Sequence, residues 1–488
     1  MKRPPPAPDP PPCTAPKPFW DGLTAIWNTH LWLPQRTIAD KHLSKSSWFN
    51  AKICTPHVPL IPDELPPLWT LIPPEEPPPE PDPKKLKKDK EEKEPLKILK
   101  IRIYPTPEQR QTLLKWIGTT RWTYNQCLSL IKDDRKNRNQ EILRSHCTNA
   151  DSPLLAEENP WVMETPFDIR REGMRDLGKA ITSNFAAGRK TFEMRYRSKK
   201  DPQQSIYVPS KHWGRSSGMM ASVLRADKLK GESLLPEFLE HDSRIVRTRL
   251  GHWYFCTPIG VEVKGDNQAP PPQRHGVIAL DPGVRTFMTG YDPDGRMVEW
   301  GCKDMNTIYK LCHTLDDLES RWSFKETPHA VRYRMKKAGA RIRLKIRRLI
   351  DDCHRKLAKF LVTNYRVVLI PKFETSKMVK RGGRKIGSKT ARAMLTWSHY
   401  RFREHLLQKA REYPWCRVIL CDEPYTSKTC TNCSALNHKL GGSKTFKCPI
   451  CHHKIDRDWN AARNILLRYL TIRRIIPPGV FSALSLAP

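Results

Sequence analysis

The hydrophobic pattern of the chain becomes regular at Leu96–Tyr104, where apolar and polar residues alternate as they do in a half-buried strand. A helical period follows, with apolar residues recurring from Leu113 to Ile131. Thr106 is placed to cap this helix, and Pro107 suits its first position because no backbone N–H bond is needed there. The pattern therefore predicts a strand followed at once by a long helix.

Strand-like stretches return at residues 191–262, after a second helical stretch that begins at Pro166. Strands on both sides of a helical region predict a β-barrel with a helical insertion, which is a suitable platform for nucleic acid. We expect the barrel to comprise residues 97–110 and 191–270 and the insertion to comprise residues 111–190.

From Gly276 onward the pattern is that of an α/β domain. The apolar run Gly276–Leu280 predicts a buried strand that ends at Asp281, and two further strands should flank a turn at 292–295. The elements expected after this hairpin are a basic helix at 328–363, a strand at 366–371, a helix at 389–412, a strand at 416–421 and a helix at 459–470. This element order is that of a ribonuclease-H-like fold, which residues 271–425 and 455–470 should form.

Two Cys-x-x-Cys motifs lie between the last strand and the last helix of this domain. Cys430 pairs with Cys433 and Cys448 with Cys451, and fourteen residues separate the two motifs. Four thiolates at this spacing can surround one Zn²⁺ tetrahedrally at about 2.3 Å each. We therefore expect residues 426–454 to form a zinc ribbon inserted into the α/β domain.

Three carboxylates fall near the ends of predicted elements: Asp281 after the first strand, Glu374 after the fourth and Asp458 at the last helix. Phosphodiester hydrolysis uses such a cluster to hold two divalent cations about 4 Å apart. Oxygen ligands suit Mg²⁺ or Mn²⁺, whereas thiolates suit Zn²⁺, so the carboxylates are the catalytic candidates and the zinc is structural. Glu423, after the last strand, is the reserve ligand.

Charge divides the chain into a neutral N-terminal part and a basic remainder. Residues 1–96 contain equal numbers of basic and acidic side chains, so the net charge of +35 lies on residues 97–488. A body this basic suits a polyanionic partner such as nucleic acid. Residues 1–96 are rich in proline and should be largely disordered, although their tryptophan-bearing part could dock on the body. The basic run at 84–90 is either a nuclear import signal or a charged linker, and the tail at 471–488 indicates nothing.

The remaining cysteines and the hydropathy of the chain indicate in which cellular compartment the protein works. Ten of the fourteen cysteines lie outside the two motifs and show no disulfide spacing, which favours a reducing compartment. The sequence has no apolar run of about 18 residues and no apolar signal core. We expect a soluble intracellular protein without a membrane partner.

The motifs together resemble the TnpB and Fanzor family of RNA-guided DNA endonucleases, which are relatives of type V CRISPR effectors. The resemblance covers about residues 97–470 and rests on Lys100–Gln109 with Arg121–Asn125, on Ala279–Gly283, on the four cysteines and on Asp456–Ala462. It implies a split RuvC nuclease domain, a WED barrel, a REC insertion and a guide RNA of transposon origin. The family's catalytic aspartate corresponds to Asp458, and Asp456 is expected to orient the turn.

One position departs from the family pattern. Bacterial relatives carry a glutamate directly at the end of the fourth strand, where this chain has Pro371 and Lys372, neither of which ligates a metal. Glu374 follows Pro371 by three residues, a reach of at most about 10 Å of extended chain. A relocated glutamate resembles the Fanzor branch, so we expect an active, rearranged site. The alternative is a protein that has lost nuclease activity.

Basic and polar residues elsewhere are candidates for contact with nucleic acid. The helix at 328–363 carries charge of one sign, which favours contact with the phosphates of a guide–target duplex over a merely solvated face. A basic loop at 382–389 should lie beside the nuclease site. The candidates are Tyr124, Asn125, Lys199, Lys200, Gln204, Arg334, Lys337, Arg341, Lys345, Arg348, Arg381, Arg384 and Lys385. Tyr124 is equally compatible with a core position.

These features predict RNA-guided cleavage of double-stranded DNA next to a short flanking motif, by a monomer with one guide RNA or by a dimer. Two other functions stay open. One is a structure-selective nuclease that uses no guide, and the other is a non-catalytic nucleic-acid-binding descendant of such an enzyme.

Overall fold

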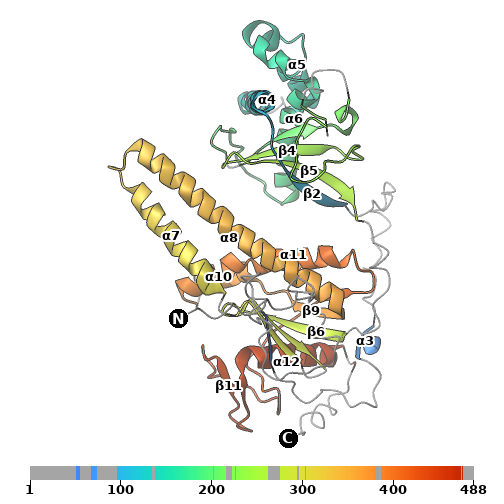
Figure 1. Ribbon diagram of the computed structural model, residues 1–488, viewed down its shortest axis with the longest axis vertical. Coiled ribbons are helices and arrows are strands. Elements are labelled where there is room, and N and C mark those ends of the chain that lie inside the picture. The colour runs from blue at the N-terminus through green and yellow to red at the C-terminus, as the bar shows by residue number, and fades with distance from the viewer. Residues whose placement is uncertain are drawn as a thin grey trace, which may run out of the picture. The chain divides into compact units, whose positions relative to one another are not determined.

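The computed structural model divides into two compact units (Figure 1). The first comprises Met1–Lys88 with Glu262–Pro488, and the second comprises Asp89–Val261. The residues that the structure describes are 51–54, 68–73, 96–134, 138–201, 203–215, 223–225, 227–261, 275–293, 296–302, 304–380, 382, 386–473 and 475.

The first unit is built on a six-stranded mixed sheet with the strand order β1-β8-β7-β6-β9-β10. The strands are β1 (Ala51–Cys54), β6 (His275–Pro282), β7 (Met288–Asp292), β8 (Arg296–Trp300), β9 (Tyr365–Pro371) and β10 (Arg417–Cys421). β9 runs parallel to both β6 and β10, whereas β7, β8 and β1 pair with their neighbours in antiparallel fashion. The carboxyl ends of the three parallel strands therefore meet at one edge of the sheet.

Helices cover both faces of this sheet (Figure 1). The first face packs on α7 (Met305–Ser323), α8 (His329–Asn364), α10 (Ser388–Trp397) and α11 (His399–Ala410), and the second on α12 (Arg457–Ile472). Ile278 and Leu280 of β6 belong to the first core, and Val277 and Ala279 to the second. Since alternate residues of β6 enter different cores, the strand is apolar from Val277 to Leu280, which explains the unbroken apolar run in the sequence.

The elements predicted after Gly276 are all present with nearly the predicted bounds, and two details differ. The helix expected at 389–412 is broken at Ser398, whose left-handed φ of 54° ends α10 before α11 begins. The second difference is α7, a helix that was not predicted and that packs on α8. A Cβ on Gly339 of α8 would lie 2.7 Å from the Trp322 ring of α7, so the absence of a side chain allows this close approach.

Parts of the N-terminal segment belong to the first unit, although the proline content of this segment did not predict ordered structure. β1 pairs with β8 from Ala51 opposite Trp300 to Cys54 opposite Met297. The short helix α3 (Leu68–Leu71) and the following residue bury Leu68 and Ile72 in the core under α12. Residues 51–54 and 68–73 are therefore ordered parts of the first unit, and the expectation that most of residues 1–96 is disordered concerns residues outside the described ones. The basic run at 84–90 and the tail from 476 lie outside the described residues.

The second unit contains a four-stranded antiparallel sheet in the order β2-β5-β4-β3. The strands are β2 (Leu96–Ile103), β3 (Gln203–Val208), β4 (Ser243–Thr248) and β5 (Trp253–Gly260). Residues near Gly231 bond to the free edge of β2, as in the bridge between Ile103 and Gly231. Within the described residues β2 and β3 do not pair, so the sheet is open there and not the closed barrel that we expected.

The predicted helical insertion is present in this unit as α4 (Pro107–Asp133), α5 (Gln140–Cys147) and α6 (Phe167–Ala186). The prediction for the start of α4 is confirmed. The Thr106 hydroxyl accepts from the Gln109 N–H at 3.3 Å, the Gln109 side chain accepts from the Thr106 N–H at 3.0 Å, and Pro107 is the first helical residue. Such a reciprocal cap satisfies two backbone donors that the helix itself cannot bond.

Shorter elements complete the description. They are the single turns η3 (Leu154–Glu158), η4 (Pro160–Glu164) and η5 (Ser210–His212), the helix α9 (Thr375–Met378), and the strands β11 (Thr445–Lys447) and β12 (Lys454–Asp456). None of the helices within the described ranges is long and apolar enough to cross a membrane.

Candidate functional site

Two of the predicted carboxylates, Asp281 and Asp458, lie together at the edge where the parallel strands end. Asp281 is the penultimate residue of β6, and Asp458 is in the first turn of α12, which packs on that strand. The third carboxylate of this group is Glu423, which follows the end of β10 by two residues. The charges of Asp458 and Glu423 both act on the Asp281 carboxyl group.

Burial and mutual repulsion raise the pKa values in this carboxylate cluster, by which we mean Asp281, Glu423 and Asp458. Loss of water raises the pKa of Asp281 well above its usual range, and Asp458 and Glu423 raise it further. Burial raises the pKa of Glu423 to about 7, and burial followed by the charge of Asp456 raises the pKa of Asp458. Each negative charge in such a cluster disfavours ionisation of the other carboxyl groups, and a bound cation removes this cost.

Glu374, which the sequence analysis favoured as the third ligand, has a different environment. It lies at the start of α9, and 55% of its side chain is exposed. Its carboxylate pairs with Lys377 at 2.5 Å, and it is not among the charges that shift the pKa of Asp281. Glu374 is thus exposed and paired with Lys377, whereas Glu423 is a carboxylate whose charge acts on Asp281, so the assignment of Glu374 as a ligand stays a prediction.

The backbone at the start of α12 fixes the position of Asp458. Asp456 is the N-cap of the helix, and its carboxylate accepts from the Asp458 N–H at 2.9 Å. Lys444 lies 3.4 Å from the same carboxylate. Asp456 thus orients the turn, as expected from the sequence, because it satisfies a donor at the helix N-terminus.

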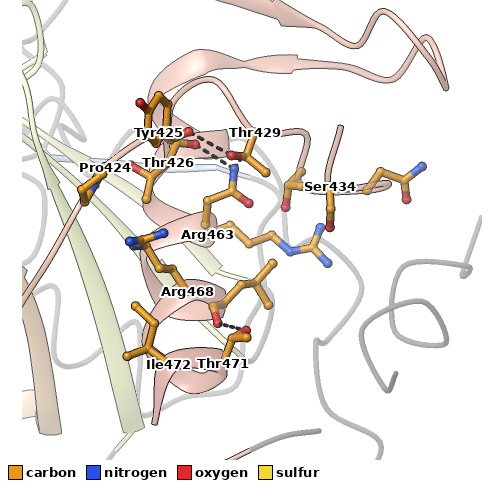
Figure 2. Close-up of a pocket in the computed structure, with 13 residues that line it drawn as sticks. Pro424, Tyr425, Thr426, Thr429, Ser434, Arg463, Arg468, Thr471 and Ile472 are labelled. Carbon is orange, nitrogen blue, oxygen red and sulfur yellow. Dashed lines mark hydrogen bonds between the residues drawn. The ribbon is translucent and has the colours of Figure 1, made fainter. Parts of the chain in front are cut away.

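Two asparagines of α12 attach the helix to the loop before the first Cys-x-x-Cys motif. Asn460 is fully buried; its amide donates to the Thr429 carbonyl at 2.7 Å and accepts from the Thr431 N–H at 3.0 Å. Asn464, one turn later, donates to the carbonyls of Thr426 and Thr429 at 2.8 and 2.7 Å. Asn460 and Asn464 therefore hold this loop, which Figure 2 shows beside α12, a role that spacing alone did not reveal.

A fourth carboxylate near this site was missed by the sequence analysis. Glu299 of β8 is 2% exposed, and it accepts from the Trp459 indole N–H at 2.9 Å. Its charge also contributes to the raised pKa of Asp458. Glu299 stands opposite Thr289, which in turn stands opposite Asp281, so all three share one face of the sheet. The signal in the sequence was a lone acidic residue within the apolar strand Met297–Trp300.

The four thiols of Cys430, Cys433, Cys448 and Cys451 form a cluster whose geometry fits a tetrahedral metal. The Cys430 and Cys451 sulfurs lie 3.7 Å apart, and the Cys433 and Cys448 sulfurs 3.4 Å apart. Zinc–sulfur bonds of about 2.3 Å in a tetrahedron place sulfurs about 3.8 Å apart. Among the described residues this is the one group of three or more potential ligands whose atoms all lie within 4.8 Å of one another.

The two Cys-x-x-Cys motifs share the same local backbone. In each motif a backbone N–H two residues after the first cysteine donates to its sulfur at 3.4 Å. The residue after the second cysteine, Ser434 or His452, adopts a left-handed φ of 59° or 58°. These turns direct both sulfurs of a motif to the same side, so the cluster is a built site and not a chance approach of four cysteines.

Five predicted nucleic-acid contacts form an exposed stripe on α8, the α8 stripe: Arg334, Lys337, Arg341, Lys345 and Arg348. Their spacing of three or four residues places them on one face of the helix. None of them forms an ion pair with a described acidic residue, whereas Arg343, on another face, pairs with Glu319 of α7. Their charge is therefore available to a polyanion.

The predicted contacts in the second unit have structural roles. Tyr124 is 5% exposed in the core under the Arg197 guanidinium, and the Asn125 amide bonds the Arg197 backbone at 3.0 and 2.8 Å. The Gln204 amide donates to the carbonyls of Ser198 and Lys199. The burial of Tyr124 agrees with the core position that the sequence analysis left open, and a DNA contact by either residue stays a prediction.

The other predicted contacts were basic residues. Lys199 and Lys200 are exposed at the turn that Gln204 holds. Arg381, Arg384 and Lys385 lie outside the described residues.

Comparison with known proteins adds two family matches. The Cas12f1-like TNB domain matches residues 399–465, which contain Glu423, the four thiols and Asp458. A family described as a helix-turn-helix domain matches residues 96–140. In this structure the second stretch is a strand followed by one continuous helix, α4, and by the first residue of α5.

Full-length relatives point in the same direction. The chain is 28% identical to the putative transposase A625R of Paramecium bursaria Chlorella virus 1, over 77% of this chain and 87% of that protein. It is 25% identical to the TnpB-like protein L770 of Acanthamoeba polyphaga mimivirus, over 75% of this chain and 72% of that protein. It is also 25% identical to a putative RNA-guided DNA endonuclease of Streptomyces pristinaespiralis, over 76% of this chain and 88% of that protein.

The fold and the site define a multidomain α/β protein in which a four-thiol loop is attached to the helix that carries a buried carboxylate. The relatives place such proteins among transposases and nucleases. Together, the family matches and the relatives support a member of the superfamily of TnpB proteins and type V CRISPR effectors.

Proposed function

We propose that this protein is an RNA-guided endonuclease of transposon origin that hydrolyses double-stranded DNA at one RuvC-type site. The observation that carries the proposal is the convergence of Asp281, Asp458 and Glu423 at the carboxyl edge of the sheet. The strand order β8-β7-β6-β9-β10 supports a ribonuclease-H-like core, because β6, the first strand in sequence, lies at the centre of these five and carries Asp281.

Asp281, Asp458 and Glu423 would hold Mg²⁺ or Mn²⁺, which supply activation of the attacking water and stabilisation of the leaving 3′ oxygen. Two ions held in this way would act together on the scissile phosphate. The protein's contribution is positional: β6 fixes Asp281, and the Asp456 cap fixes Asp458. The products would carry 5′-phosphate and 3′-hydroxyl ends.

The four thiols would hold one Zn²⁺ with a structural role. All four positions of a tetrahedral ion are filled by sulfur, so no position is left for a substrate or a water. Through Asn460 and Asn464 the thiol cluster is tied to α12, which carries Asp458. The zinc would therefore stabilise the loop that the helix contacts.

Guide RNA and target DNA are the proposed partners. The α8 stripe supplies a row of unpaired cations suited to duplex phosphates. The sheet and helices of the second unit correspond in this proposal to the WED and REC domains. Replacement of the usual strand-end glutamate by Pro371 supports assignment to the Fanzor branch, and nuclear import through residues 84–90 stays a prediction.

The test uses protein co-expressed with the RNA of its native locus. We would sequence the RNA that co-purifies and assay the particle with Mg²⁺ on a DNA library with randomised flanks, beside Asp281→Asn. The expected result is one discrete RNA and cleavage next to one enriched motif, absent in the variant. Cleavage without any discrete RNA would favour a guide-independent nuclease, and bound RNA without cleavage by the unaltered protein would favour a binding protein.

A further inference from the structure

The end of β6 that carries Asp281 is paired with another strand on one side only within the described part of the sheet. Toward β7 the pairing includes Asp281, which stands opposite Thr289. Toward β9 the pairing stops at Ala279 and Leu369. If this register continued, Asp281 would stand opposite Pro371, and a proline has no N–H to donate to a ladder. The aspartate therefore lies on a strand end that β9 does not hold.

The loop 283–287, which joins this strand end to β7, contacts two side chains from the helices that cover the sheet. Trp397, the last residue of α10, is fully buried, and its indole N–H donates to the Val284 carbonyl at 3.1 Å. The ring of Phe287 lies 4.7 Å from the ring of Trp397 and stacks on the ring of His399 at 5.1 Å, with 13° between the two planes. The loop is thus held at Val284 by a hydrogen bond and at Phe287 by two rings.

The break between α10 and α11 brings both side chains to this loop. Trp397 ends the first helix and His399 begins the second, so they are two residues apart. In an uninterrupted helix, residues at this spacing do not face the same side. The left-handed φ of 54° at Ser398 changes the direction of the chain between them, and both rings contact Phe287.

His399 contributes an uncharged ring that joins two strand ends. The side chain is 3% exposed, and burial lowers the pKa of His399 to about 4, although the Gly283 backbone beside it opposes this shift. The imidazole is therefore neutral at neutral pH. Phe373, two residues after the end of β9, packs on the same imidazole in T-shaped geometry at 4.9 Å. Ring contacts thus connect the segments that follow β6 and β9, where the ladder between these strands has stopped.

We propose that Trp397 and His399 are positioning residues of the carboxylate cluster: they hold the loop 283–287, and the loop holds Asp281 in the orientation that divalent cations require. The inference rests on the proposed function for the presence of those cations. Asp281 precedes the loop by two residues, so a displaced loop turns the end of β6 and its carboxylate with it. Groups that orient metal ligands contribute about 10- to 100-fold to metal affinity.

Trp300 of β8 provides the matched control. It is fully buried in the same core as Trp397, but its indole N–H has no hydrogen-bond partner among the described residues. Trp397→Phe and Trp300→Phe remove the same atoms from this core. A difference between the two variants therefore measures the bond from Trp397 to the Val284 carbonyl.

The experiment measures cation binding, so it does not depend on cleavage. Full-length protein, freed of nucleic acid and checked for its zinc content, is titrated with Mn²⁺, and free Mn²⁺ is followed by electron paramagnetic resonance. The binding that Asp281→Asn removes is the binding at the carboxylate cluster. Trp397→Phe should weaken this binding about tenfold, and Trp300→Phe should change it less than about twofold.

Two further readouts separate positioning from general loss of packing. Hydrogen exchange of peptides that cover the loop 283–287 should be faster in Trp397→Phe than in Trp300→Phe, because only the first variant loses a bond to the loop. His399→Leu, which fills space without a ring, should weaken Mn²⁺ binding about threefold or more. His399→Phe restores a ring beside Phe287 and should bind Mn²⁺ within about twofold of the unaltered protein.

Equal Mn²⁺ affinities of Trp397→Phe and Trp300→Phe would overturn the inference, even if the loop exchanged faster in the first variant. That result together with guided cleavage by the unaltered protein would leave the proposed function standing. The expected difference in Mn²⁺ affinity, found in a protein that does not cleave DNA, would do the reverse.

Discussion

The environments of Glu423 and Glu374 differ in the two properties that matter for a metal ligand. Glu423 is partly withdrawn from water beside Asp281, so its pKa is raised to about 7 and a cation would be its main source of stabilisation. Glu374 already has a cation, Lys377, and is half exposed. A buried carboxylate without a counter-charge pays a desolvation cost that binding of a divalent ion offsets.

This contrast gives a paired prediction. Glu423→Gln should lower the rate of DNA cleavage at least about 100-fold, since even groups that only orient metal ligands are worth 10- to 100-fold. Glu374→Gln should change the rate no more than about twofold, as expected for an exposed side chain. Single-turnover cleavage at saturating Mg²⁺ measures both. A large loss for Glu374→Gln with normal activity for Glu423→Gln would reverse the assignment.

Asn460 carries a second prediction at this scale. Asn460→Ala should leave the Thr429 carbonyl and the Thr431 N–H without their partner in a buried place, at a cost of about 1–3 kcal/mol each. The thiol loop should then open more often, so zinc should transfer faster to a colorimetric chelator. Asn184→Ala, in helix α6 of the second unit, is the control and should leave zinc release unchanged. Equal release rates for the two variants would show that Asn460 does not hold the loop.

Sequence spacing identified some of these residues and could not identify others. Local patterns indicated the four cysteines, Asp281 and Asp458. The cysteines have the Cys-x-x-Cys spacing, Asp281 ends an apolar run, and Asp458 lies in the stretch Asp456–Ala462. Glu423 ranked below Glu374 because the choice depends on which carboxylate the fold buries and which finds Lys377, and neither is a local property. Glu299 and Asn460 act across elements, through Trp459 and Thr429.

At the level of elements, periodicity located the long strands and helices and failed for short ones. β1 and α3 span four residues each, too few for a period, and prolines surround them. Their positions come from tertiary contacts: the ladder with β8 and the core under α12. The break between α10 and α11 depends on one residue, Ser398, whose conformation a propensity does not indicate.

The docking of α3 predicts that the N-terminal segment stabilises the first unit. Leu68→Ala or Ile72→Ala should lower the stability of the first unit by about 2–5 kcal/mol, because these side chains are only 5% and 2% exposed. Leu71→Ala on the same helix removes a side chain that is 38% exposed and should cost much less. Urea unfolding, followed by hydrogen exchange of β6 and β9, measures the difference. Identical midpoints for Leu68→Ala and Leu71→Ala would contradict the packing of α3.

At the scale of the whole molecule, charge is the property that the sequence predicted best. The net charge of +35 lies outside residues 1–96, and the structure gathers five of these charges on one face of α8 without acidic partners. Net charge alone could not show which cations are free. Arg343 and Arg392 are equally basic, yet they pair with Glu319 and Asp316.

The α8 stripe therefore allows a charge-matched comparison. Arg341→Gln with Lys345→Gln removes two cations of the stripe, and Lys336→Gln with Arg347→Gln removes two exposed cations from the other side of the same helix. Both double variants have the same net charge, so a partner that senses only total charge would bind them equally.

If the stripe follows the phosphates of a guide–target duplex, the first variant should bind an RNA–DNA hybrid at least tenfold more weakly than the second at 150 mM salt. The plot of log affinity against log salt should also become shallower by roughly one to two units for the first variant alone, because each lost phosphate contact releases one counterion fewer. Equal affinities and equal slopes would assign the basic face of α8 to solvent.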